Sequence, residues 1–237
     1  MRLIFAICLV LTIMTPPFAN ADINASNRAE LNKVIEDYIR NNPEVVRDTL
    51  MALAAREEAE RKQTGLAKVR NDLGDPVMGN PNGKITLYEF SDYNCGYCKR
   101  VFEPIQQLLR DNPDVRLVIK EFPILSQSSL VAAKAAIAAE MQGKFGAYHI
   151  AMMTYRGQIT DDVVMRLAAQ AGVDEKQLKI DMESPKTTAI IQRTREAAAA
   201  LAINGTPALV VGNTVIPGAI GRDELVKLIA EERNKQG

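Results

Sequence analysis

The chain has 237 residues, of which 47% are hydrophobic, and its 29 basic residues balance its 29 acidic residues. This length allows one domain with a sizeable core and an additional region. The balanced charge gives no electrostatic reason to expect a nucleic acid as partner. Alanine-rich and Glu/Lys/Arg-rich stretches indicate a large helical content.

The first 21 residues have the pattern of a cleavable signal peptide. Arg2 precedes an apolar run from Leu3 to Met14, which is too short to cross a bilayer core of about 30 Å as a helix. Small residues in Ala19-Asn20-Ala21 predict cleavage after Ala21. The alternative is an uncleaved membrane anchor. Cleavage would remove Cys8 and leave Cys95 and Cys98 in a compartment where disulfides persist.

Residues 22–74 are predicted to form a separate helical region. Asn42-Pro43-Glu44 is typical of a helix start, which divides the region into two amphipathic helices, and Gly65 is expected to interrupt the second. Two such helices cannot bury both apolar stripes alone, so they either pack on their own domain or oligomerise. The stripes contain Leu31, Val34, Ile35, Tyr38 and Ile39 in the first helix, and Val45, Val46, Leu50, Leu53 and Ala54 in the second.

Residues 75–237 are predicted to form the main domain, which begins after a turn-rich segment at 74–83. The predicted order is a strand, a helix and a strand, then a series of helices, then a hairpin and a closing helix. The first two strands are expected to pair in parallel through a right-handed crossover. The predicted strands are 85–91, 115–122, 208–211 and 214–216, and the predicted helices are 95–110, 128–142, 145–155, 161–171, 174–182, 185–201 and 222–234.

Cys95-Gly96-Tyr97-Cys98 stands where the first strand gives way to a helix. Free N–H groups and the helix dipole at that position stabilise a thiolate, which favours Cys95 as a nucleophile and Cys98 as the thiol that resolves a mixed disulfide. A zinc site is disfavoured because few further cysteine or histidine ligands are available. An inert structural disulfide is disfavoured because so small a loop contributes little chain-entropy stabilisation.

The chain resembles the thioredoxin superfamily, and its helical insertion at about 126–202 is similar to that of the DsbA family. The resemblance covers residues 76–237 and rests on Leu87-Tyr88-Glu89-Phe90, Cys95-Gly96-Tyr97-Cys98-Lys99 and Gly205-Thr206-Pro207-Ala208. It implies an α/β thioredoxin-like fold and a redox-active Cys95–Cys98 disulfide with no cofactor. It also implies a cis-proline loop at Thr206-Pro207 that aligns substrate backbone, although Gly205-Thr206-Pro207 alone is typical of a helix-ending turn.

Glu89 lies six residues before Cys95, where thioredoxin-like proteins carry a buried acid that shuttles protons. Alternation with Tyr88 and Phe90 leaves open a partly solvated position. Lys120 and Glu121 on the neighbouring strand are expected to form a solvated pair rather than a buried cluster. His149 is expected to be a packing or surface residue and not a catalyst.

Gly96-Tyr97 between the cysteines, together with Thr206 before the proline, resembles the periplasmic isomerase DsbC and lacks the Pro-His of DsbA. The N-terminal extension, notably 37–45, is similar to the suppressor-of-copper-sensitivity C proteins, which oligomerise through N-terminal helices. The resemblance implies a periplasmic, oligomeric disulfide isomerase, either dimer or trimer. It would act on misfolded or reduced exported proteins and be recycled by a membrane redox partner. The alternatives are a monomeric dithiol oxidase and a copper-binding or copper-tolerance protein.

Overall fold

The computed structural model describes residues 25–236, so the expected signal peptide at 1–21 lies outside the described residues. The chain divides after Ala55 into two compact units. The first unit contains α1 (Ala25–Asn41) and the beginning of α2 (Pro43–Arg70), and α2 starts at the predicted proline. Among the described residues, no helix has both the length and the apolar character needed to cross a membrane.

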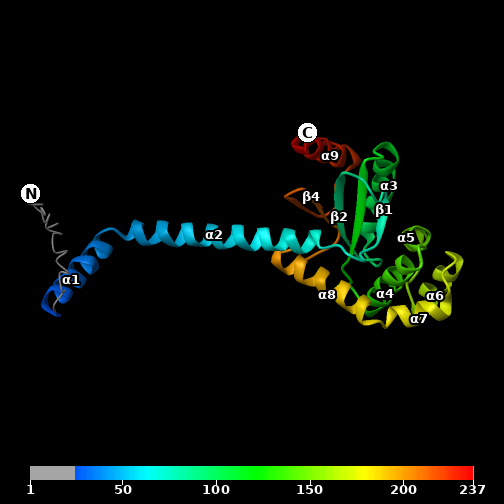
Figure 1. The fold of residues 1–237 in the computed structure, drawn as a ribbon, viewed down its shortest axis with the longest axis horizontal. Coiled ribbons are helices and arrows are strands. Elements are labelled where there is room, and N and C mark those ends of the chain that lie inside the picture. Colours follow the sequence, from blue (N-terminus) through cyan, green and yellow to red (C-terminus); the bar gives the residue numbers. More distant parts are fainter. Residues whose placement is uncertain (1–24, 237) are drawn as a thin grey trace, which may run out of the picture. The chain divides into compact units, whose positions relative to one another are not determined.

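The second unit contains a five-stranded sheet with the order β1-β3-β2-β4-β5 (Figure 1). The predicted parallel pair is confirmed: β2 and β3 run side by side, with Ile85 opposite Val115 and Ser91 opposite Glu121. The predicted hairpin is also confirmed, because β4 and β5 pair antiparallel around Gly212-Asn213. The strands are β1 (Val77–Gly79), β2 (Ile85–Ser91), β3 (Val115–Glu121), β4 (Ala208–Val211) and β5 (Thr214–Pro217).

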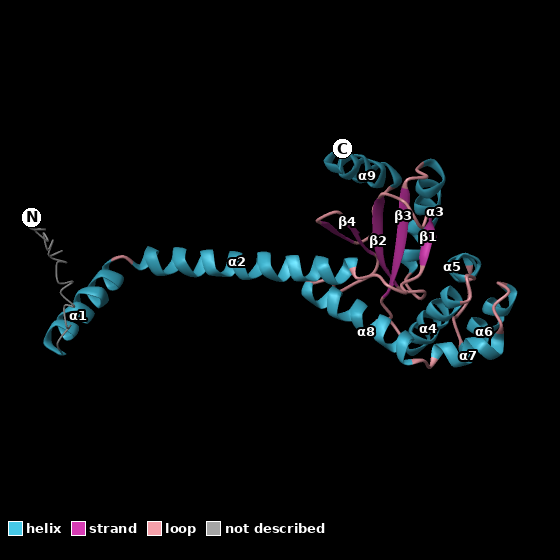
Figure 2. Cartoon of the chain, in the orientation of Figure 1, coloured by secondary structure: helices cyan, strands magenta, loops and turns pink. Residues whose placement is uncertain are grey.

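A helical insertion separates β3 from β4, as the sequence predicts, and α4, α6 and α7 lie together at one end of the strands (Figure 2). Gly143 and Gly172 follow the ends of α4 and α6 with positive φ angles of 66° and 78°, a conformation that glycine adopts without strain. The helices of this unit besides α2 are α3 (Gly96–Asp111), α4 (Gln127–Met141), α5 (Phe145–Thr154), α6 (Asp161–Gln170), α7 (Glu175–Met182), α8 (Pro185–Ala200) and α9 (Arg222–Gln236).

Each face of the sheet is covered by a different set of helices. Leu87, Leu117 and Ile119 pack in a large cluster with side chains of α3, α9 and the helical insertion. Tyr88 and Phe90, which point the other way because side chains alternate along a strand, pack in a second cluster with side chains from the ends of α2 and α8. The face that carries Leu87 is the one that α3, and therefore Cys98, covers.

The predicted interruption of α2 at Gly65 is wrong, because α2 continues to Arg70. Gly65 serves a packing role: a Cβ atom there would lie 2.6 Å from Cδ2 of Leu201, at the end of α8. The next residues, Leu66 and Val69, are buried in the second cluster. The last turns of α2 therefore belong to the core of the second unit, which the highly charged sequence before Gly65 does not indicate.

The expectation that Lys120 and Glu121 form a solvated pair is also wrong, since both side chains are buried and they point to opposite faces of β3. Lys120 Nζ lies 2.6 Å from Oδ2 of Asp75, and both side chains have 0% exposure. Arg193 of α8 makes a second ion pair with the same oxygen at 3.0 Å. Asp75 thus joins the segment after α2 to β3 and α8. This network was not predicted from the sequence, and β1 was not predicted because residues 74–83 have the composition of turns.

Replacing Asp75 by Asn tests this network. Because the change leaves Lys120 buried without its counter-charge, we expect the free energy of unfolding to fall by about 3–5 kcal/mol in urea titrations. The matched control is Glu103→Gln, which breaks the exposed Glu103–Arg110 pair and should cost less than about 1 kcal/mol. Equal losses of unfolding free energy in the two variants would contradict the role of Asp75 as the counter-charge of Lys120.

Candidate active site

Cys95 occupies the N-cap of α3, directly after the carboxyl end of β2. Its backbone N–H donates to the carbonyl oxygen of Asp92 at 3.0 Å, and its Sγ accepts the N–H of Cys98 at 3.3 Å. In its protonated form, the Cys95 thiol donates to the carbonyl oxygen of Thr206 at 3.1 Å. Both cysteines are free thiols. The structure therefore brings together the helix start and the Thr206 loop, as the resemblance implies.

The two sulfurs have opposite electrostatic environments. The hydrogen bond from the Cys98 thiol, together with hydrogen bonds from backbone N–H groups, lowers the pKa of Cys95 to about 5 although partial burial opposes this. The pKa of Cys98 is raised, first because its thiol donates to Cys95 and then because it is buried near Glu89. Cys95 is thus a thiolate at neutral pH, and Cys98 keeps its proton.

Glu89 lies on β2, on the face that α3 covers, and its side chain is buried. Burial raises its pKa to about 7, and the negative charge of Cys95 adds to the effect. A solvated position is therefore excluded. A carboxyl group with a pKa near 7 can both accept and release a proton at neutral pH.

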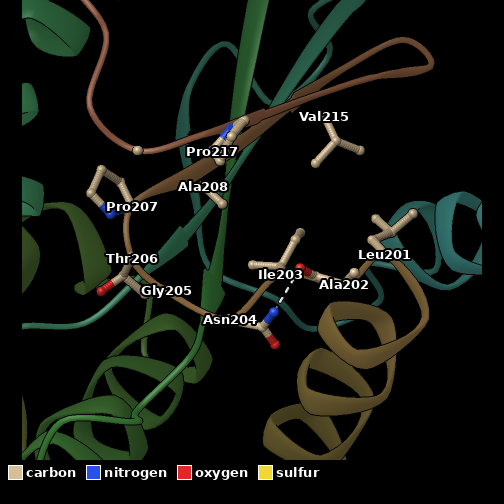
Figure 3. Close-up of a pocket in the computed structure, with 11 residues that line it drawn as sticks. Leu201, Ala202, Ile203, Asn204, Gly205, Thr206, Pro207, Ala208, Val215 and Pro217 are labelled. Carbon is tan, nitrogen blue, oxygen red and sulfur yellow. Dashed lines mark hydrogen bonds between the residues drawn. The ribbon is translucent and has the colours of Figure 1, made fainter.

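The Thr206–Pro207 peptide bond is cis, in agreement with the resemblance. Figure 3 shows this loop continuing from the end of α8, where the side chain of Asn204 donates to the carbonyl oxygen of Ala202. A cavity of about 250 Å³ lies beside it, lined by Leu201, Ile203, Pro207, Val215 and their neighbours. The loop thus contacts the Cys95 sulfur and also borders an apolar cavity.

Gly96 and Tyr97 are exposed at the first turn of α3. A Cβ atom on Gly96 would meet nothing within 4 Å, and Tyr97 is 60% exposed. The guanidinium group of Arg100 lies 3.8 Å from the centre of the Tyr97 ring. These residues therefore form surface around the cysteines.

Asp92 is a site residue that the sequence analysis missed. Its buried carboxylate accepts hydrogen bonds from the N–H groups of Ile124 and Leu125 at 2.9 and 3.1 Å and from the Ser129 hydroxyl at 2.7 Å. Since the backbone of Asp92 also holds Cys95, the residue joins the redox turn to the loop after β3. A single acidic residue beside a CxxC motif does not indicate, in the sequence, that it joins these two segments.

His149 is buried on α5, so its predicted packing role is confirmed and a surface position is excluded. Its ring lies against Tyr93, Phe102 and Phe145. Burial lowers its pKa to about 3, so the ring is neutral.

Residues 86–230 match the family model of the DSBA-like thioredoxin domain, which covers more than half of the chain. The chain belongs to the DsbA-like thioredoxin family. It therefore carries the domain of a thiol–disulfide oxidoreductase family, as the resemblance implied. The predicted thioredoxin-like fold with a helical insertion is confirmed.

Solved structures extend this likeness. A thioredoxin-like oxidoreductase from Silicibacter pomeroyi DSS-3 is 42% identical, with a TM-score of 0.68 over 70% of this chain and 96% of that one. ScsC from Proteus mirabilis, in a transitional conformation, is 27% identical, with a TM-score of 0.68 over 90% of this chain and 99% of that one. A periplasmic thioredoxin-like protein from Salmonella enterica serovar Typhimurium is 31% identical, with a TM-score of 0.63 over 71% and 95%. The resemblance to the ScsC-like branch is thus confirmed.

The curated relatives are longer proteins. The Na(+)/H(+) antiporter NhaA 1 of Mycolicibacterium gilvum (strain PYR-GCK) is 30% identical over 142 residues, which are 58% of this chain and 23% of the antiporter. The chain therefore spans about a quarter of the length of that relative.

The pH dependence of Cys95 alkylation by iodoacetamide tests whether the Cys98 thiol lowers the pKa of Cys95. Because only the thiolate reacts, we expect the rate to fall to half near pH 5. In Cys98→Ala, the midpoint should move to higher pH since the main hydrogen-bond donor is lost. Cys95→Ala is the control and should not be alkylated at neutral pH. An unchanged midpoint in Cys98→Ala would contradict the assigned cause.

Proposed function

We propose that this protein is a periplasmic thiol:disulfide oxidoreductase that acts as an oligomeric disulfide isomerase through Cys95 and Cys98. The observation that supports the chemistry is the Cys95 sulfur, which accepts a hydrogen bond from the N–H of Cys98 and whose pKa is lowered to about 5. A stabilised thiolate also favours the reduced form of the pair, which an isomerase needs for attack on a wrong disulfide. Export through a signal peptide at residues 1–21 is part of this proposal.

In the proposed reaction, the Cys95 thiolate attacks one sulfur of a substrate disulfide. A bond forms between Cys95 and that sulfur, and the other substrate sulfur leaves as a thiolate. This thiolate can attack a different disulfide and rearrange the substrate. Alternatively, Cys98 loses its proton to Glu89 and attacks Cys95, which forms the Cys95–Cys98 disulfide and releases reduced substrate. A membrane redox partner would then reduce the pair again.

Thr206 and Pro207 are proposed to align the substrate. The carbonyl oxygen of Thr206 lies 3.1 Å from the Cys95 sulfur, so an extended substrate segment beside this loop would pass next to the nucleophile. Gly96 and Tyr97 offer exposed surface at the same point. Misfolded or reduced exported proteins, whose cysteines are accessible in extended segments, fit this arrangement.

The N-terminal unit supports the proposed oligomer. Its large apolar side chains are exposed, with Leu50 at 59% and Met51 at 64%. Exposed apolar stripes of this size are typical of helices that bind other helices. An oligomer would present several redox sites to one misfolded chain. The exposed set is Leu31, Val34, Ile35, Tyr38, Ile39, Val45, Val46, Leu50, Met51 and Leu53.

Reactivation of scrambled, multi-disulfide ribonuclease tests the activity. We expect reactivation by the chain without residues 1–21 and none by Cys95→Ala, because the nucleophile is absent. Little reactivation combined with rapid oxidation of a reduced substrate would favour the dithiol oxidase instead.

Leu50→Lys tests the oligomer. We expect analytical ultracentrifugation to show a shift to monomer and ribonuclease reactivation to fall severalfold, because a charge on an apolar helix interface is costly to bury. The control is Asp48→Lys, on the opposite side of the helix, which should keep the parental mass. Deleting residues 22–55 is the stronger variant, and it spares Leu66 and Val69 of the buried core. A deletion variant that keeps the parental assembly state would contradict the proposed oligomerisation through the N-terminal helices.

A further inference from the structure

Two neighbouring cavities beside the cis-proline loop have no part in the exchange reaction described so far. The first, of about 250 Å³, is bordered by the loop itself, and the second, of about 150 Å³, lies next to α2. Leu201, Ala202 and Val215 line both cavities, so the two are adjacent. Figure 3 shows the lining of the first cavity, which extends from Thr206 and Pro207 at one end to Leu201 and Val215 at the other.

The first cavity begins next to the nucleophile. The carbonyl oxygen of Thr206 lies 3.1 Å from the Cys95 sulfur, and Thr206 and Pro207 also line the cavity. A substrate group that enters the cavity would therefore be joined to the sulfur under attack by only a short length of chain. Most of the remaining wall is apolar and belongs to the second hydrophobic cluster, with side chains from Leu201, Ile203, Ala208 and Val215.

The first cavity has room for one large apolar side chain. An apolar cavity of about 150 Å³ can hold a benzene molecule, and this cavity has about 250 Å³. Asn204, a polar residue of the lining, already donates its amide to the carbonyl oxygen of Ala202. The side chain of a leucine or a phenylalanine from a substrate therefore fits both the size and the lining of the cavity.

Ala202 stands at the border of the two cavities in a strained conformation. Its φ of 53° lies in the left-handed region, which residues other than glycine rarely adopt. Strain of this kind persists only where the surrounding structure imposes it, and it is common at binding sites. The turn leads the chain from the end of α8 along the cavity wall to Thr206. Because the alanine side chain borders both cavities, a larger side chain at this position would occupy space in them.

The second cavity has charged side chains on its border. Its lining includes Glu58, Arg61 and Lys62 of α2, which belong to the second unit. Leu201 holds this part of α2 beside the cavities, because it packs directly against Gly65. Two cations against one anion favour an acidic group of a bound chain, and salt would weaken the attraction because these side chains are exposed.

We propose that the two cavities form a substrate subsite of the redox centre, which binds an extended segment of an unfolded protein. A large apolar side chain near the substrate cysteine enters the first cavity, and an acidic residue farther along contacts Arg61 and Lys62. The inference rests on the proposed thiol–disulfide exchange. The Cys95 sulfur beside the Thr206 end of the cavity favours this occupant, because the substrate chain must pass the loop while its sulfur is attacked.

Such a subsite would select unfolded chains. Large apolar side chains are mostly buried in folded proteins, so an extended segment presents them only before folding or after misfolding. Binding of the side chain in the cavity would also hold the substrate sulfur close to Cys95, which increases the rate of attack.

The test uses synthetic peptides that contain one cysteine joined to thionitrobenzoate by a disulfide. The Cys95 thiolate attacks the peptide sulfur, and a disulfide forms between Cys95 and the peptide. Thionitrobenzoate leaves as a coloured thiolate with the electron pair of the broken bond. The peptides carry leucine or serine at each position near the cysteine in turn, and reaction with free glutathione corrects for their intrinsic reactivity.

In the unmodified protein, leucine at one or more of these positions should increase the rate constant for release about tenfold relative to serine. Glutamate in place of lysine farther from the cysteine should add a smaller increase that disappears at high salt.

Two variants alter the first cavity without changing the cysteines. Val215→Asp places a charge in its apolar wall, and Ala202→Phe fills space that the two cavities share. Each should abolish most of the leucine preference. Thr214→Asp is the matched control and should keep the preference, because Thr214 is exposed on the same strand and its side chain points to the other face of the sheet. Partial unfolding of a variant lowers both rate constants equally, so their ratio reports on the subsite alone.

The outcomes separate this inference from the proposed function. A parental protein that does not distinguish leucine from serine, or a preference that survives in both cavity variants, would overturn the subsite and leave the exchange chemistry standing. A change of assembly state in Val215→Asp with the leucine preference intact would overturn it in favour of a contact between two copies of the chain. An equal response to glutamate and lysine would overturn the part assigned to Arg61 and Lys62. A coloured release that is absent, or that Cys95→Ala does not abolish, would overturn the proposed exchange itself.

Discussion

The hydrogen bonds at the Cys95 sulfur are the interactions on which the redox site depends. A thiolate at a partly buried position is costly unless donors surround it, and here the first turn of α3 and the thiol of Cys98 supply them. The same contact keeps the proton on Cys98. One short motif thus produces two thiols of opposite character, which ordered attack and resolution require.

The sheet determines the rest of the site because it fixes the directions in which the side chains of β2 and β3 point. β2 ends at the turn that carries Asp92 and Cys95, and its alternation sends Glu89 toward α3 and Tyr88 away from it. β3 repeats the alternation, so Lys120 joins the ion pairs with Asp75 and Arg193 on one side while Glu121 joins Tyr93 on the other. Glu89 beside the cysteines and the ion pairs of Asp75 therefore lie on opposite faces of one sheet.

The helical parts of the chain serve different purposes. The insertion between β3 and β4 brings His149 and Tyr148 beneath the redox turn, where their aromatic rings surround Tyr93. The last turns of α2 are core elements of the second unit, as Leu66 and Val69 show. The helices before Ala55 have apolar side chains that stay exposed within the described chain. This contrast is the basis for our proposal that the N-terminal unit serves assembly and not catalysis.

The sequence by itself determined the features that depend on local patterns. The strand–helix–strand order predicted the parallel pair, helical patterns predicted the insertion, and the Gly212-Asn213 turn predicted the hairpin. The CxxC motif at a strand-to-helix junction predicted the candidate nucleophile, because helix-end electrostatics depends on a few consecutive residues. Only the tertiary structure decided whether Glu89, Lys120 and Glu121 are buried, since burial depends on which distant helices cover a strand. It likewise joined Asp75 to Arg193 and Tyr93 to His149, because partners far apart along the chain leave no periodic signal in either segment.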